Sequence, residues 1–92
     1  MQVPEEFKRL TRCFLQGSDR EAANEEEWIA RALALNTLEQ QAVIRKFLAE
    51  LLVEQTNSED LQRAWNSGGS SYGLHAKGIR RFLEKIRDMI HA

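Results

Sequence analysis

The chain has 92 residues, of which 42% are hydrophobic and 29% are charged, and its formal net charge is −1. This length and apolar fraction predict one domain over residues 1–92, and the mixture of charged and apolar residues excludes an intrinsically disordered protein. The nearly neutral balance argues against nucleic acid as the main partner.

Two helices are predicted in the first third of the chain. Pro4, followed by two glutamates, suits the start of a helix over residues 4–16, because proline lacks an N–H and acidic groups complement the helix dipole. Residues 18–23 are polar and predict a loop. Asn24, with Glu27 three positions on, predicts the N-cap of a second helix, whose buried stripe comprises Trp28, Ile29, Ala32 and Leu33.

The longest helical pattern covers residues 37–55, without Gly or Pro. Thr37 and Gln40 fit a capping box at its start. Its apolar residues form one broad arc: Val43, Ile44, Phe47, Leu48, Leu51 and Leu52, widened by Leu38 and Val53. Such an arc predicts a central helix with neighbours on at least two sides.

Two more helices complete the prediction. Ser58 is the expected N-cap of a short helix that ends at Gly68 and Gly69 and faces inward through Leu61, Ala64 and Trp65. The last helix, at residues 77–91, has the most regular amphipathic pattern. Because no stretch alternates as a strand does, the sequence predicts an all-α domain, a compact bundle of about five helices around the central helix at residues 37–55.

Charge is distributed unevenly. Residues 19–60 contain ten acidic and four basic residues, a net of −6, whereas residues 61–92 contain six basic and two acidic residues, a net of +4. An acidic middle beside a basic tail indicates either intramolecular complementarity or an acidic face for a basic partner.

The chain has no motif for catalysis or metal binding. His75 and His91 lie sixteen residues apart without a second cysteine, so the spacing of a metal site is missing. Cys13, on a predicted helix, is expected to be a small packed hydrophobe rather than an activated thiolate. The glycine-rich residues 68–73 lack the spacing of a phosphate loop. We therefore expect no enzyme, no cofactor and no metal.

The expected location is the cytoplasm. The N-terminus lacks the apolar region of a signal peptide, and no apolar run approaches the roughly 20 residues of a membrane span. A single cysteine forms no intramolecular disulfide, which is compatible with a reducing compartment. No membrane contact is expected.

Residues 58–90 combine three features in a fixed order. A short helix ends in a Leu-x-x-x-Trp pattern, a Ser- and Gly-rich turn with an aromatic follows, and the last helix carries a Phe-Leu-x-x-Ile-Arg core; these residues are Leu61, Trp65, Asn66 to Tyr72, Phe82, Leu83, Ile86 and Arg87. This order resembles the C-terminal half of a family of small contact-dependent growth inhibition immunity proteins. The three preceding helices also fit the family's layout. Residues 16–21 depart from the aromatic, acid-rich stretch of many members, so toxin contacts there do not carry over by analogy.

The resemblance implies a non-enzymatic protein that binds and blocks the C-terminal toxin domain delivered by neighbouring bacteria, often a nuclease acting in the cytoplasm. An acidic middle suits a basic nuclease surface, since charge complementarity speeds capture. The candidate toxin-binding residues are Asp19, Glu21, Glu25, Glu26 and, as an aromatic anchor, Tyr72. We expect the protein to be a monomer or a weak dimer.

The competing prediction is a small helical nucleic-acid-binding regulator. It would use the basic face of the last helix, formed by Arg80, Arg81, Lys85 and Arg87. Glu84 and Asp88 interrupt this face and the domain is not basic overall, so a solvated face is the simpler interpretation and no direct nucleic-acid binding is expected. A helical adaptor in another complex is a third alternative.

Overall fold

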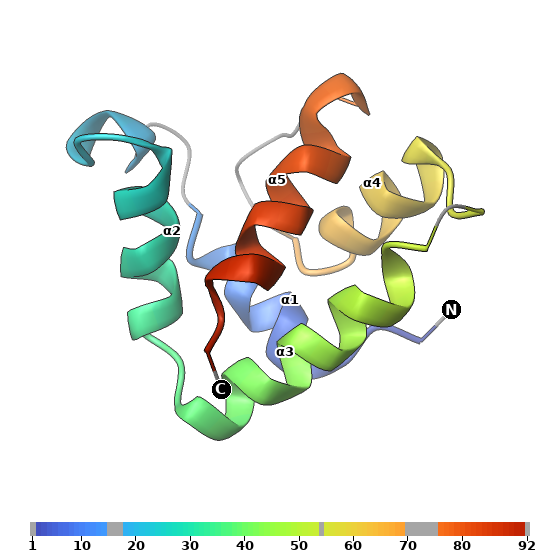
Figure 1. The fold of residues 1–92 in the computed structure, drawn as a ribbon, viewed down its shortest axis with the longest axis horizontal. Coiled ribbons are helices and arrows are strands. Elements are labelled where there is room, and N and C mark those ends of the chain that lie inside the picture. Colours follow the sequence, from blue (N-terminus) through green and yellow to red (C-terminus); the bar gives the residue numbers. More distant parts are fainter. Residues whose placement is uncertain (1, 15–17, 54, 70–75, 92) are drawn as a thin grey trace.

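The computed structural model describes residues 2–14, 18–53, 55–69 and 76–91. These residues form five α-helices and one 3₁₀ helix, in the order α1 (Glu5–Arg12), η1 (Ser18–Glu21), α2 (Glu25–Ala34), α3 (Leu38–Leu51), α4 (Ser58–Asn66) and α5 (Ala76–Met89). No strand occurs in these ranges, which confirms the all-α prediction. The long helix α3 packs against both α1 and α5, and α5 also packs against α4 (Figure 1).

One aromatic network connects all five helices. It contains every Phe and Trp of the chain, namely Phe7, Phe14, Trp28, Phe47, Trp65 and Phe82. Phe14, just after α1, is fully buried, and its ring centroid lies 4.9 Å from that of Trp28, 5.4 Å from Trp65 and 5.5 Å from Phe82. Such pairs contribute about 0.5–1.5 kcal/mol each beyond the burial of their area.

The end of α1 differs from the prediction, because the helix stops at Arg12 rather than near residue 16. The backbone N–H groups of Cys13 and Phe14 donate to the carbonyl oxygens three residues earlier, at 2.9 and 3.2 Å. After this tighter turn Phe14 is still fully buried, on the same side as Phe7 and Leu10.

Helix α3 is also shorter than predicted, since it ends at Leu51 with Leu52 as its C-cap. The guanidinium of Arg80, from α5, donates to the carbonyl oxygens of Leu52, at 3.4 Å, of Val53, at 3.2 Å, and of Thr56. A helix end leaves its last carbonyls without helical partners. Here a side chain from another helix supplies the missing donors, so the chain turns away four residues before the predicted end.

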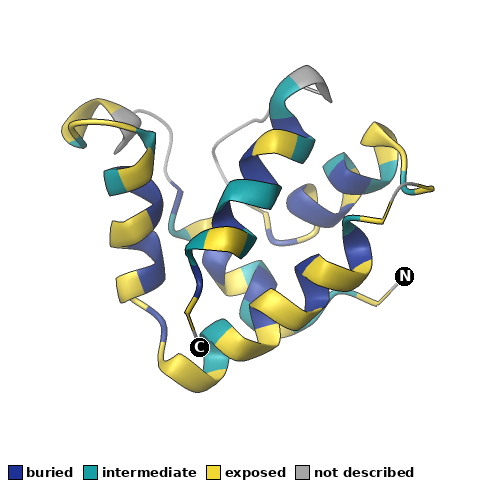
Figure 2. Ribbon diagram, viewed as in Figure 1, coloured by how far each residue is buried: buried dark blue, intermediate teal, exposed yellow. Residues whose placement is uncertain are grey.

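The buried arc of α3 is narrower than predicted. Ile44, Phe47, Leu48 and Leu51 are buried, but Leu38 is 72%, Val53 45% and Val43 38% exposed. Figure 2 shows exposed residues along the outer side of this helix. The sequence shows which side chains of a helix are apolar, but their burial depends on where neighbouring helices lie. Here α1 and α5 cover only part of the apolar arc of α3.

Two predicted caps are confirmed. The backbone N–H of Glu27 donates to Asn24 Oδ1 at 2.8 Å, so Asn24 caps α2. Thr37 and Gln40 form a complete capping box at the start of α3, with both reciprocal hydrogen bonds present. Local sequence rules suffice at these places because cap and recipient lie three residues apart.

Two other local predictions are wrong. Asn57, not Ser58, caps α4, because its side-chain oxygen accepts from the N–H of Asp60 at 2.9 Å. Asn and Ser are both good N-cap residues, so the sequence alone does not decide which of these two neighbours caps α4. Residues 18–21, predicted as loop, form the short 3₁₀ helix η1.

Gly68, two residues beyond the end of α4, is buried against α1. A Cβ there would lie 2.0 Å from Thr11 Oγ1 and 2.7 Å from the carbonyl oxygen of Lys8. The Nε of Arg12 donates to the Gly68 carbonyl oxygen at 2.7 Å. Gly69 follows with φ +72°, a conformation that glycine adopts without strain. The predicted glycine stop of α4 is therefore confirmed and also provides the contact with α1.

The substitution Gly68→Ala tests this contact. We expect it to destabilise the protein by about 1–3 kcal/mol, because the added methyl overlaps the α1 backbone. The matched control is Gly78→Ala in α5, where none of the described residues, apart from the adjacent helix backbone and chain neighbours, lies within 4 Å of the new Cβ. This change should be neutral or stabilise by up to about 1 kcal/mol through helix propensity. Urea unfolding followed by circular dichroism measures both, and equal midpoints for Gly68→Ala and wild type would contradict the proposed close packing.

Candidate partner-binding surface

The Asn24 cap places Glu25 and Glu26 in the first turn of α2. The Glu25 carboxylate accepts from the Arg81 guanidinium at 3.2 and 3.4 Å and lies 3.5 Å from Lys85 Nζ. Lys85 Nζ also lies 3.4 Å from the Glu26 carboxylate. These four side chains, Glu25, Glu26, Arg81 and Lys85, form the α2–α5 ion-pair cluster. At this place the complementarity of the acidic middle and the basic tail is intramolecular.

The predicted toxin-binding residues occupy different environments. The Glu25 side chain is 31% exposed and faces two cations, whereas that of Glu26 is 68% exposed. Glu21 is exposed at the end of η1, the element that packs against α2, and Asp19 belongs to the same element. Tyr72 lies outside the described residues. The structure therefore brings Glu25 and Glu26 together and places Glu21 on a neighbouring element.

All four residues of the basic face of α5 have internal partners. Arg80 binds the carbonyl oxygens at the end of α3, and Arg81 and Lys85 belong to the ion-pair cluster. Arg87 Nε lies 2.9 Å from the Asp88 carboxylate. Three of these cations therefore pair with carboxylates of the same chain, and Arg80 instead hydrogen-bonds to backbone carbonyls.

The thiol of Cys13 is poorly suited to nucleophilic chemistry. Partial burial raises its pKa, and this effect outweighs the opposing influences of the Asn36 side chain and the Arg9 charge. Because the thiolate is the reactive form, a raised pKa keeps the group protonated near neutral pH. Its Sγ lies 3.4 Å from the carbonyl oxygen of Arg9, to which it donates.

Within the described residues, no group of three or more His, Cys, Asp and Glu side chains is placed to hold a metal ion. In the same ranges, no helix combines the length and the hydrophobicity that crossing a membrane requires.

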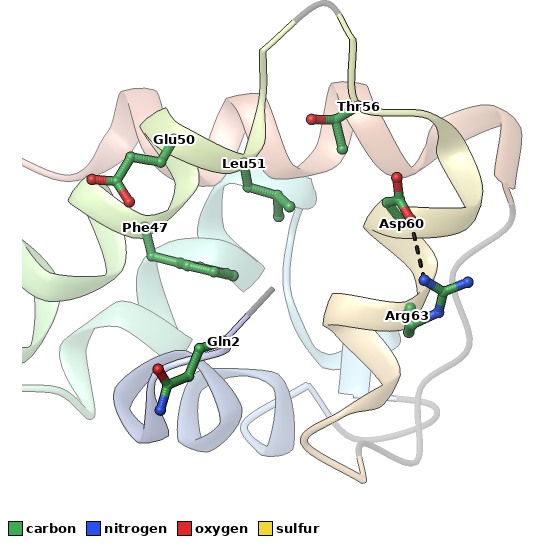
Figure 3. Close-up of a pocket in the computed structure, with 7 residues that line it drawn as sticks. All are labelled: Gln2, Phe47, Glu50, Leu51, Thr56, Asp60 and Arg63. Atoms are coloured by element: carbon green, nitrogen blue, oxygen red, sulfur yellow. Dashed lines mark hydrogen bonds and ion pairs between the residues drawn. The ribbon is translucent and has the colours of Figure 1, made fainter.

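A surface hollow of about 520 Å³ lies between the N-terminal segment, α3 and α4 (Figure 3). Its lining comprises Gln2, Phe47, Glu50, Leu51, Thr56, Asp60 and Arg63. Asp60 and Arg63 pair with each other at 3.2 Å on one side, and the Phe47 ring projects into the space (Figure 3). This lining, as far as the structure describes it, contains no histidine or cysteine and mixes opposite charges.

Sequence reasoning missed the two most exposed large hydrophobic residues that the structure describes. Leu35 and Leu38, each 72% exposed, flank the turn between α2 and α3, and we call this pair the apolar corner. The prediction assigned Leu38 to the buried arc and gave Leu35 no role. A signal was present, because Asn36 and Thr37 break the helix between them, and leucines on either side of a break need not share a buried stripe.

No protein-family model, curated protein or solved structure matches this chain. A function is therefore inferred from its own surface. That surface combines exposed carboxylates around the start of α2, a basic face whose charges are paired internally, and an apolar corner between α2 and α3.

The internal role of Arg80 generates a stability prediction. We expect Arg80→Lys to destabilise the protein by about 1–3 kcal/mol, because lysine retains the charge but lacks the planar fork that reaches several carbonyls. The same change at the adjacent Arg81, whose side chain is 69% exposed, should cost less than about 1 kcal/mol. Urea unfolding of both variants makes the comparison, and equal losses would show that Arg80 does not stabilise the end of α3.

Proposed function

We propose that this protein is a cytoplasmic immunity protein, which binds and neutralises the C-terminal toxin domain, a nuclease, of a contact-dependent growth inhibition system. The resemblance of residues 58–90 to that family supports the proposal. Residues that carry the resemblance lie on α4 and α5 and are buried in the core: Leu61, Trp65, Phe82, Leu83 and Ile86.

The pairing of charges is the observation that carries the proposal. The four cations of the basic face, Arg80, Arg81, Lys85 and Arg87, are engaged by carboxylates and carbonyls of the same chain. In contrast, the exposed carboxylates of Glu21 and Glu39 form no ion pair within the described residues. These carboxylates belong to residues 19–60, whose net charge is −6. A surface of negative net charge attracts a basic protein, and the nucleic-acid-binding surface of a nuclease is basic.

The same pairing disfavours the nucleic-acid-binding alternative. A phosphate group approaching α5 would have to compete with Glu25 and Glu26 for Arg81 and Lys85, and these carboxylates would repel it. Arg80 would have to leave the carbonyl oxygens that end α3. An inhibitor that binds a basic protein requires neither change.

Calorimetric titration against the toxin domain encoded next to this protein's gene tests the proposal. We expect one-to-one binding with a Kd in the nanomolar range, about −12 kcal/mol, and loss of toxin activity in the same mixture. Absence of heat at micromolar concentrations would contradict the proposal. Binding to mixed-sequence DNA or RNA that weakens steeply with salt would support the regulator instead.

Charge reversal at Glu21 or Glu26 tests the acidic surface. We expect Glu26→Lys and Glu21→Lys each to slow association several-fold at low ionic strength and much less at high salt, because steering by charge is screened. The matched control, Glu59→Lys, makes the same charge change on α4, at the opposite side of the molecule from α2 (Figure 1). Glu25 is left intact because a lysine at this less exposed position would face both Arg81 and Lys85, whereas the more exposed Glu26 pairs, among the described residues, with Lys85 alone.

Stopped-flow association measurements at two salt concentrations provide the rates, and thermal unfolding checks that each variant is folded. If Glu21→Lys and Glu26→Lys associate as fast as Glu59→Lys, the start of α2 is not the surface that steers the toxin.

A further inference from the structure

The apolar corner lies beside a hollow of about 370 Å³ between α2 and the end of α5. Ala30 and Ala34 from α2, Leu38 from α3 and Met89 from α5 contribute to its lining. The two alanines lie four residues apart, on one face of α2, and both are exposed. Their small side chains leave room for a group from outside, next to two leucines that solvent already reaches.

The corner is held rigidly by polar contacts. The Gln41 amide donates to the carbonyl oxygens of Leu33, at 2.9 Å, and Asn36, at 3.1 Å. The Asn36 amide, itself buried, donates to the carbonyl oxygen of Ala32 at 2.9 Å. With the capping box of α3, these bonds satisfy the end of α2 and the start of α3 without using either leucine. The backbone that carries the leucines is therefore preorganised, which lowers the cost of ordering this turn on binding.

Two carboxylates lie beside this surface, and His91 also lines the hollow. Glu39, directly after Leu38, is exposed and forms no ion pair within the described residues. Glu26 lies four residues before Ala30 on the same face of α2 and is exposed. The nearby cation Arg31 is paired with Glu27. An apolar hollow with carboxylates at both ends suits an apolar side chain that projects from a basic surface.

We propose that the apolar corner and its hollow are the anchor site for the toxin domain, and that they receive an aliphatic or aromatic side chain surrounded by Lys and Arg residues. This inference rests on the proposed immunity function and names where the partner is held. A second copy of this chain fits less well, because a two-fold contact through Leu35 and Leu38 would bring the two Glu39 carboxylates toward each other.

Neutral substitutions test the anchor without altering the steering charge. We expect Leu38→Gln, which removes the apolar contact, and Ala34→Met, which fills the hollow, each to raise the toxin's dissociation rate about tenfold or more. Association rates should stay within about twofold, since anchors act mainly on dissociation. The matched control is Val53→Gln, an equally polar change at an exposed residue just beyond the other end of α3. All three positions are exposed, so urea midpoints should remain near wild type.

The outcomes separate the two proposals. If wild type binds the toxin domain and both corner variants dissociate at the wild-type rate, the anchor site is wrong while the immunity function stands. If wild type does not bind the toxin domain, both proposals fall. A wild-type dimer in light scattering that Leu38→Gln abolishes would identify a second copy as the occupant and overturn the basic partner.

Discussion

The contact of Phe14 with Trp28 holds α2 to the rest of the molecule. Trp28 projects from α2 into the aromatic network, where its ring meets Phe14 edge-on at 4.9 Å and Phe82 at 5.6 Å. Among the residues that the structure describes, the ion-pair cluster at the start of α2 adds charged contacts between this helix and α5. Because α2 is fixed through one face and one end, its opposite face, with Ala30 and Ala34, remains open to solvent. The surface proposed to bind a partner thus depends on the aromatic core behind it.

Much of the fold was predictable where its causes are local. Asn24 and the Thr37–Gln40 capping box act over three residues, and their hydrogen bonds occur as predicted. The end of α3 was not predictable in this way, because its carbonyls are satisfied by Arg80, whose position in α5 is more than twenty residues away. Leu38 illustrates the same limit, since the periodicity of α3 includes it but no neighbouring helix covers it.

The candidate site was only partly predictable, for a related reason. The opposite net charges of the middle and the tail allowed either an internal or an external partner for the acidic residues. Which one applies to Glu25 depends on the packing of Trp28 against Phe82, because that contact brings the start of α2 alongside Arg81. Composition and spacing contain no information about this packing. The structure shows internal cationic partners for both Glu25 and Glu26. Tyr72 lies outside the described residues.

Because of the ion-pair cluster, different residues of α2 are expected to contribute to the association rate and to the affinity for a partner. Glu25 is half-buried between two cations, so a basic partner would have to displace Arg81 or Lys85 to use it, and the exchange of one ion pair for another gains little. Exposed carboxylates with fewer internal partners, such as Glu26, act at longer range on the approach of the partner. Lasting attachment then has to come from desolvated apolar contact. On α2 and its turn, the apolar corner offers that contact, because Leu35 and Leu38 are already ordered and exposed.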